Sequence, residues 1–85
     1  HSAIREGVSV LDKDAAYVVD GWADMTGVDW RFNRDLAAKR ASMVARIMRE
    51  EGFENVSVGR AMVHPEKDLT YRKAVILKKK KGFSE

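Results

Sequence analysis

The chain has 85 residues, no cysteine and a formal net charge of +3, with 45% hydrophobic and 34% charged residues. This composition is typical of one small globular domain, and it excludes disulfides, thiol catalysis and sulfur-based zinc sites. No apolar run approaches the roughly 20 residues of a membrane helix, and much of the positive charge lies in the run 78–81, which disfavours a nucleic-acid surface.

The first third of the chain predicts a helix, a strand and a loop. Segment 2–13 has apolar residues at helical spacing, namely Ile4, Val8 and Leu11. Segment 15–22 is centred on β-branched and aromatic residues and predicts a strand. The glycine-bounded segment 21–27 follows, and it predicts a turn of the kind that often carries function.

The clearest element is a long helix over residues 31–51, ended by Gly52. Its predicted apolar stripe consists of Leu36, Met43, Val44, Ile47 and Met48. The four methionines of the chain are expected mainly to fill the core.

The last third of the chain predicts two strands joined by a loop. We expect a short strand over 55–59, a polar loop around 64–68 and a final strand over 70–79. The apolar centre of the final strand, residues 74–77, is continuous rather than alternating, which predicts a central position or burial on both faces.

The order helix, strand, helix, strand, strand predicts an α+β fold, a two-layer αβ sandwich with two helices on one face of a small mixed sheet. We expect a single domain over residues 1–85, with 78–85 as a solvated basic tail. Because a three-stranded sheet under two helices is thin, we also expect the chain to be truncated at its N-terminus and to lack a first strand. The exposed sheet edge would invite strand exchange or a homodimer.

Arg40 is the anomaly of the long helix. At about 100° per residue, it projects close to Leu36 and Ile47, within the apolar stripe, and Asn33 lies on the same face. A guanidinium directed at a sheet needs an anion or other acceptors, and Asp24 is the closest plausible anion.

Two interpretations of Asp24 and Arg40 remain open. In the first, they form an internal ion pair that joins the loop to the helix. In the second, they stand side by side in a cleft and hold a zwitterion, the carboxylate taking an ammonium and the guanidinium taking a carboxylate. Free N–H groups at the helix N-terminus near Asn33 would favour the same anion.

Three segments resemble motifs of the OmpA-like C-terminal domain family. The helix segment is similar to the family signature N-x-x-L-S-x-x-R-A-x-x-V through Asn33, Leu36, Ala37, Arg40, Ala41 and Val44. The segment 21–27 resembles the G-H-T-D-x-x-G loop, and the segment 71–76 resembles N-R-R-V-x-I in the last strand. Together the three motifs span most of the chain.

The resemblance implies a β-α-β-α-β-β fold and a non-catalytic module. Members of the family bind the diaminopimelate residue of the peptidoglycan stem peptide without a cofactor, and so anchor outer-membrane or envelope proteins in the Gram-negative periplasm to the cell wall. By position, Asp24 would take the ligand ammonium and Arg40 its carboxylate. Thr26 and Asn33 match supporting polar positions, and Arg72 matches an arginine of the last-strand motif.

The chain departs from the family pattern at several positions. Trp22 replaces the usual histidine, Ala37 the serine and Tyr71 the asparagine, and the segment between Gly27 and Asn33 is one residue longer. None of these changes removes a ligand-binding charge. Trp22 is expected either to stack on the ligand or to pack where strand meets loop.

Other functional classes have weaker signals. The chain has no Gly-rich phosphate loop, no Ser/His/Asp set and no carboxylate pair suited to hydrolysis, so we do not expect an enzyme. His64 beside Pro65 is expected to be an ordinary loop residue. Two alternatives to peptidoglycan binding are kept: an interaction domain with a degenerate ligand site and an internal Asp24–Arg40 pair, and a basic RNA-binding domain, which lacks an aromatic strand motif.

Overall fold

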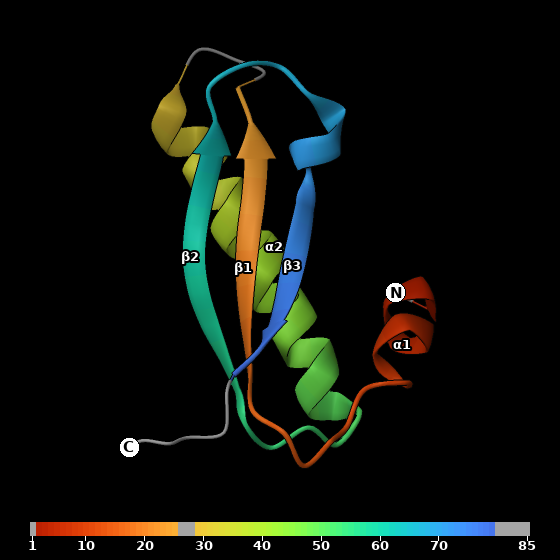
Figure 1. Cartoon of the computed structure of the whole chain (residues 1–85). Helices are drawn as coiled ribbons and strands as arrows, with labels where there is room; N and C mark the ends of the chain where they lie inside the picture. The colour runs from red at the N-terminus through yellow and green to blue at the C-terminus, as the bar shows by residue number, and fades with distance from the viewer. Residues whose placement is uncertain (1, 26–28, 80–85) are drawn as a thin grey trace.

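The computed structural model of the chain describes residues 2–25 and 29–79 (Figure 1). In chain order the elements are α1 (Ser2–Val8), β1 (Tyr17–Asp24), α2 (Trp30–Glu50), β2 (Val56–His64), the short 3-10 helix η1 (Leu69–Tyr71) and β3 (Lys73–Lys78). The protein is therefore an α+β domain with two helices and a small mixed sheet, as its order of elements predicted.

The three strands form one sheet in the order β2-β1-β3, so β1 is central. β1 and β2 are parallel, which the crossover through α2 requires, whereas β1 and β3 are antiparallel. The prediction of a central or doubly buried last strand is therefore wrong for the described residues. β3 lies at an edge, and its side chains are half-buried or exposed.

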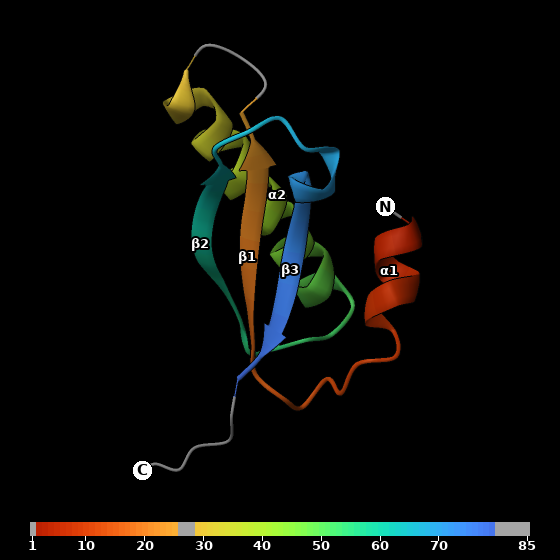
Figure 2. The same cartoon turned by 45° about the horizontal axis from the view of Figure 1, so that its top comes forward.

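The helix α2 lies along one face of the sheet, and the opposite face faces the viewer in Figure 1. The residues of β1 alternate accordingly: Tyr17, Val19, Gly21 and Ala23 are buried, whereas Val18, Asp20 and Trp22 are half-buried. α1 stands beside β3 in Figures 1 and 2, and its contacts with other elements are mainly with α2.

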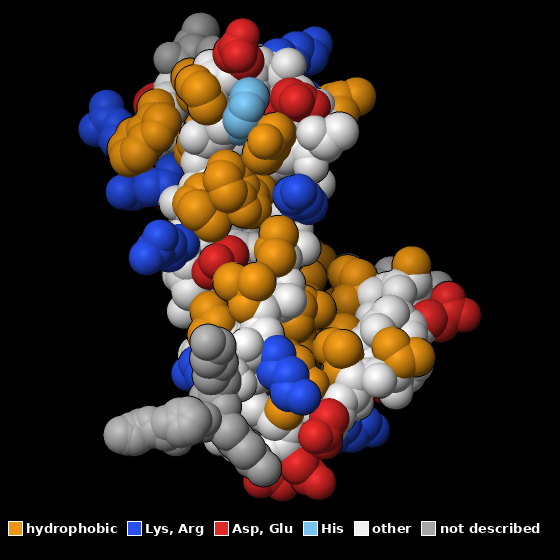
Figure 3. All heavy atoms as spheres, in the orientation of Figure 1, with side chains coloured by type: hydrophobic (Ala, Val, Ile, Leu, Met, Phe, Trp, Pro, Cys, Tyr) orange, Lys and Arg blue, Asp and Glu red, His pale blue; other side chains and the backbone are white. Residues whose placement is uncertain are grey.

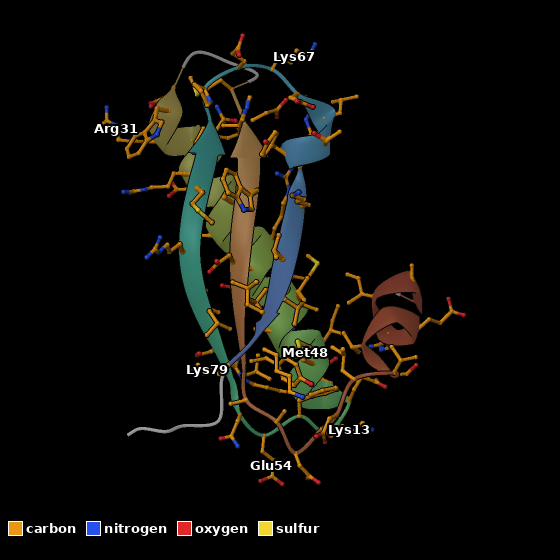
Figure 4. All side chains as sticks on the ribbon, in the orientation of Figure 1. Lys13, Arg31, Met48, Glu54, Lys67 and Lys79 are labelled. Carbon is orange, nitrogen blue, oxygen red and sulfur yellow. The ribbon has the colours of Figure 1, made fainter. Side chains whose placement is uncertain are left out.

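The buried stripe of α2 is built largely from small residues: Ala37, Ala41, Val44, Ala45, Ile47 and Met48. The sequence predicted Val44, Ile47 and Met48 correctly, and Figure 4 shows Met48 near the C-terminal end of the helix. Met43, however, is 42% exposed and Leu36 is only half-buried. The stripe is rotated because alanines allow the helix backbone to approach the sheet more closely than leucine or methionine would.

Gly21 lies inside β1, not at the start of a turn as predicted. A Cβ atom at this position would overlap the backbone carbonyl of Ala37. The glycine is therefore required by the close approach of α2 to the sheet, and the strand continues through it to Asp24.

The ends of α2 agree with the predicted boundaries to within one residue. Asp29 is the N-cap, and its side chain accepts a hydrogen bond from Arg31 N at 2.9 Å. Gly52 adopts a φ of 101°, the left-handed conformation that glycine provides after a helix. The predicted stop at this glycine is confirmed.

The remaining boundaries differ from the predictions. α1 ends at Val8, so it is shorter than the predicted segment 2–13. β2 runs on to His64 past a bulge, where Gly59 and Arg60 lie opposite Asp20. The final strand begins only at Lys73, because residues 69–71 form η1.

The predicted basic tail 78–85 begins too early, since Lys78 still belongs to β3. Residues 80–85 lie outside the described residues. In the described part of the chain, neither helix is long and apolar enough to cross a membrane.

The core lies between α2, the sheet and α1. Its largest fully buried side chain is Phe53, which packs edge-on against Tyr17 with 5.6 Å between ring centroids. Val8 of α1 is also fully buried, and Ile4 and Leu11 pack against the same cluster. This core holds the lower half of β1 in Figure 1, whereas the candidate site lies at the other end of the strand.

Candidate functional site

The candidate site is built around the last residue of β1, the buried carboxylate of Asp24. Its side chain is 2% exposed and accepts two hydrogen bonds, one at each oxygen. Arg72 Nε donates to Oδ1 at 2.9 Å, and the backbone N–H of Asp68 donates to Oδ2 at 2.8 Å. Asp24 thus joins the end of the central strand to the segment that leads into β3.

The environment of Asp24 favours its charged form. Burial by itself would raise the pKa of the Asp24 carboxyl, because it removes water from the charge. The hydrogen bonds from Arg72 and Asp68, together with the positive charge of Arg72, outweigh that effect and hold the pKa below its usual value. The carboxylate is therefore ionised at neutral pH, as ammonium binding would require.

A local turn places Arg72 at this carboxylate. Asp68 caps η1, and its Oδ1 accepts hydrogen bonds from Thr70 N at 3.0 Å and Thr70 Oγ1 at 2.7 Å. These two bonds lower the pKa of the Asp68 carboxyl. The turn brings Arg72, immediately before β3, level with the end of β1.

Arg40 reaches the same strand from α2, as its place in the apolar stripe predicted. Its terminal nitrogen Nη1 donates to the backbone oxygen of Trp22 at 2.8 Å. The predicted ion pair between Asp24 and Arg40 does not form, because Arg72 occupies Oδ1 of Asp24 and Arg40 contacts β1 two residues earlier. The sequence-based pairing was wrong in its partner, not in the need of each charge for one.

Asn33 is buried and connects the start of α2 with the end of the preceding segment. Its Nδ2 donates to the backbone oxygen of Asp29 at 3.3 Å and lies 3.6 Å from the sulfur of Met25. Its exposure is only 1%. Its printed contacts hold the helix start in place, and its predicted role as a ligand contact stays a prediction. Thr26 lies outside the described residues.

An aromatic cluster adjoins Asp24 on the side of the sheet opposite α2. The Trp22 ring lies 5.2 Å from that of Tyr71, and His64 stacks on Tyr71 at 4.0 Å with an angle of 17° between the planes. Lys73 Nζ lies 5.3 Å from the centre of the Tyr71 ring. Trp22 therefore packs where strand meets loop, which was one of the two roles expected for it.

Sequence reasoning missed Asp68 and the Tyr71–His64 stack. An aspartate two residues before a threonine is a common turn signal, because the carboxylate can accept from the backbone N–H two residues later. That signal could have identified η1. The stack has no sequence signal, since seven positions separate the two rings and the turn between them sets their distance.

The site as a whole combines one buried carboxylate with two guanidinium groups. Arg40 uses Nη1 on Trp22 and Arg72 uses Nε on Asp24, and within the described residues no further hydrogen bond engages either guanidinium. A guanidinium offers five N–H donors in a planar fork that matches a carboxylate. The arrangement suits a ligand that carries a carboxylate. In the described part of the chain, no cluster of three His, Cys, Asp or Glu side chains could hold a metal ion.

Comparison of the chain with protein-family models, curated proteins and solved structures finds no match. Function is therefore inferred from the site itself and from the motif resemblance.

Proposed function

We propose that this chain binds the stem peptide of peptidoglycan without covalent chemistry, through its diaminopimelate residue. In this proposal the chain is an OmpA-like domain, with the β-α-β-α-β-β order of that family, and it anchors an outer-membrane or envelope protein in the periplasm to the cell wall. It works without a cofactor and without catalysis.

The observation that carries the proposal is the pairing of an ionised carboxylate with guanidinium groups at one strand end. Diaminopimelate is a zwitterion, with an ammonium and a carboxylate on one carbon at each end. The free donors of Arg40 could take the carboxylate in bidentate fashion. Asp24 is held in its charged form and would attract the ammonium, in competition with Arg72.

Arg72 has a defined part in this proposal. It neutralises Asp24 in the unliganded protein and leaves Nη1 and Nη2 without a partner among the described residues. Its side chain is 37% exposed, whereas that of Asp24 is 2% exposed. The ligand would therefore meet Arg72 first, and binding at Asp24 requires a small displacement of the guanidinium.

The competing candidate is an interaction domain in which Asp24 is purely structural. Its support is the occupancy of both Asp24 oxygens by Arg72 and Asp68. In this case the carboxylate holds the turn before β3 and has no ligand. The two candidates differ in whether the folded wild-type chain binds a zwitterion at all.

The test is a chemical-shift titration with meso-diaminopimelate and with a soluble muropeptide. The variants are Arg40→Ala, Arg40→Lys and, as a matched control, Arg46→Ala, whose side chain on the same helix is 72% exposed. We expect saturable binding by wild type and by Arg46→Ala. Arg40→Ala should weaken it about tenfold, the loss of one charge-assisted interaction, and Arg40→Lys should restore it only in part because lysine lacks the planar fork.

Absence of binding by the folded wild type would reject the proposal and favour the structural candidate. Equal weakening by Arg40→Ala and Arg46→Ala would also reject it, because the effect would then reflect net charge alone.

A further inference from the structure

The outer edge of β3 carries unpaired backbone groups. Lys79 N donates to Ala16 O at 2.8 Å, which makes these two residues a hydrogen-bonded pair of the antiparallel ladder. Such pairs alternate along the ladder. The backbones of Val75 and Leu77 therefore bond β1, whereas those of three residues point outward: Ala74, Ile76 and Lys78.

An apolar hollow lies directly beside this edge. It has a volume of about 770 Å³ and separates β3 from α1 and the segment after it. From one side it is lined by Ile4, Val10 and Leu11, and from the other by Ala74, Ile76 and Lys78. Figure 3 shows hydrophobic side chains on both sides of the gap between α1 and the sheet. The outward backbone groups and the lining side chains thus belong to the same three β3 residues.

The sequence of β3 also fits a strand with a neighbour on each side. Residues 74–77 are continuously apolar, the pattern of a strand buried on both faces, yet β3 lies at the edge and Leu77 is 47% exposed. Val10, across the hollow, is 84% exposed. A strand placed in the hollow would bury these side chains and pair the free backbone groups.

The other edge of the sheet is less suited to such pairing. β2 contains the bulge at Gly59 and Arg60, where the register with β1 shifts. A bulge bends and twists an edge and so opposes the addition of a strand. β3, in contrast, keeps one register with β1 along its whole length.

The charges of β3 indicate which strand fits. Residues 72–79 contain Arg72, Lys73, Lys78 and Lys79 and no acidic residue. In a two-fold pairing of two copies centred on Ile76, Lys73 would lie opposite the second copy's Lys79. Like charges directly opposite each other destabilise a sheet. Self-association through this edge is therefore disfavoured, which argues against the homodimer expected from the sequence.

We propose that the β3 edge and the adjoining hollow accept a polypeptide strand from outside residues 1–85, with alternating apolar residues and acidic residues at both ends. The strand pairs with the backbones of Ala74, Ile76 and Lys78, and its apolar side chains enter the hollow. Its acidic ends lie near Lys73 and Lys78. This site is separate from the proposed peptidoglycan site and does not depend on it.

The test uses a capped nonapeptide in which two pairs of glutamates flank Thr-Val-Thr-Val-Thr. Amide hydrogen exchange of the full chain is measured by NMR with and without the peptide. We expect slower exchange at the outward amides of Ala74, Ile76 and Lys78. The amides of Val75 and Leu77 already bond β1 and should not change, so they serve as an internal control.

Two further peptides test the recognition chemistry. A peptide with lysines in place of the glutamates should bind more weakly, and one with proline at the central threonine should not protect the amides, because it cannot complete the ladder. Equal protection by the proline peptide would overturn the proposal.

Charge-reversal variants test the chain itself. The double variant Lys73→Glu with Lys78→Glu should weaken the glutamate peptide about tenfold and tighten the lysine peptide. The matched control, Lys39→Glu with Lys67→Glu, makes the same charge change away from the edge; Figure 4 shows Lys67 in the loop beyond the strand ends. Similar losses in both double variants would contradict the proposal.

Three other results decide the matter. Arg40→Ala should leave peptide binding unchanged, which separates this test from that of the peptidoglycan site. Protection of the outward amides in the absence of peptide, together with a concentration-dependent dimer in ultracentrifugation, would assign the edge to a second copy and overturn the proposal. Unchanged exchange at all three outward amides at saturating peptide would also overturn it.

Discussion

Asp24 and Arg72 form a buried-to-surface ion pair between residues 48 positions apart, with 2.9 Å between Oδ1 and Nε. The pair links the end of the central strand β1 to the start of the edge strand β3. Because Asp68 N donates to the other oxygen, the carboxylate also holds the turn that precedes β3. One side chain thus fixes three segments that meet at the candidate site.

Asp24→Asn should destabilise the fold. Both carboxylate oxygens face donors, so an amide must turn its NH₂ group toward either Arg72 Nε or Asp68 N. We expect a lower midpoint in urea unfolding than for Asp35→Asn, the same change at an exposed position of α2. Equal midpoints for the two variants would show that the pair contributes nothing to stability.

Acid should remove the contribution of Asp24 selectively. The folded-state pKa of Asp24 is lower than the value of about 3.9 for an unfolded chain. Its contribution is therefore fully present above that value and is lost as the pH falls through the folded-state pKa. The difference in unfolding free energy between wild type and Asp24→Asn should be constant near neutral pH and shrink in this acid range. A difference that grows on acidification would contradict the lowered pKa.

Gly21→Ala should be strongly destabilising. The new Cβ atom would overlap the carbonyl of Ala37, and a helix backbone cannot move aside as a flexible side chain can. We expect a cost of about 3 kcal/mol, the upper range for overpacking. Gly7→Ala is the matched control: no atom lies within 4 Å of its Cβ, and a gain of up to about 1 kcal/mol is expected within helix α1. Urea unfolding measures both.

Phe53→Ala should remove much of the stability of the core. The ring is 1% exposed and contacts Tyr17 edge-on, so its loss leaves a cavity beside the central strand. We expect a cost of about 3–5 kcal/mol, against about 0.5 kcal/mol or less for Phe32→Ala. Phe32 is 62% exposed. Calorimetry of the two variants would expose a wrong assignment of the core if their melting temperatures coincided.

Local patterns determined the elements of the fold that depend on neighbours in sequence. The long helix follows from apolar spacing between an Asp29 cap and a Gly52 stop, and both lie within a few residues of the backbone groups they satisfy. The anomaly of Arg40 was likewise visible from helical periodicity. These signals survive because hydrogen bonds in and around a helix connect residues three or four positions apart.

Tertiary structure decided the partners of the charged residues. Arg40 and Arg72 could each reach the end of β1, and the sequence favoured Arg40 because the position of η1 was not predicted. The turn capped by Asp68 carries Arg72 to the carboxylate first, and Arg40 then takes the carbonyl of Trp22. Which cation pairs with a buried anion depends on the path of the whole chain.

The last strand separates the two kinds of information most clearly. Its apolar run predicted a strand with neighbours on both sides, and the composition alone determined that residues 74–77 seek burial. Only the tertiary structure placed this strand at the edge of the described sheet, with its outward backbone groups beside an apolar hollow. The physical reason is that hydrophobicity sets how much surface a strand needs to bury, whereas strand order, which is decided by long-range pairing, sets what is available to bury it.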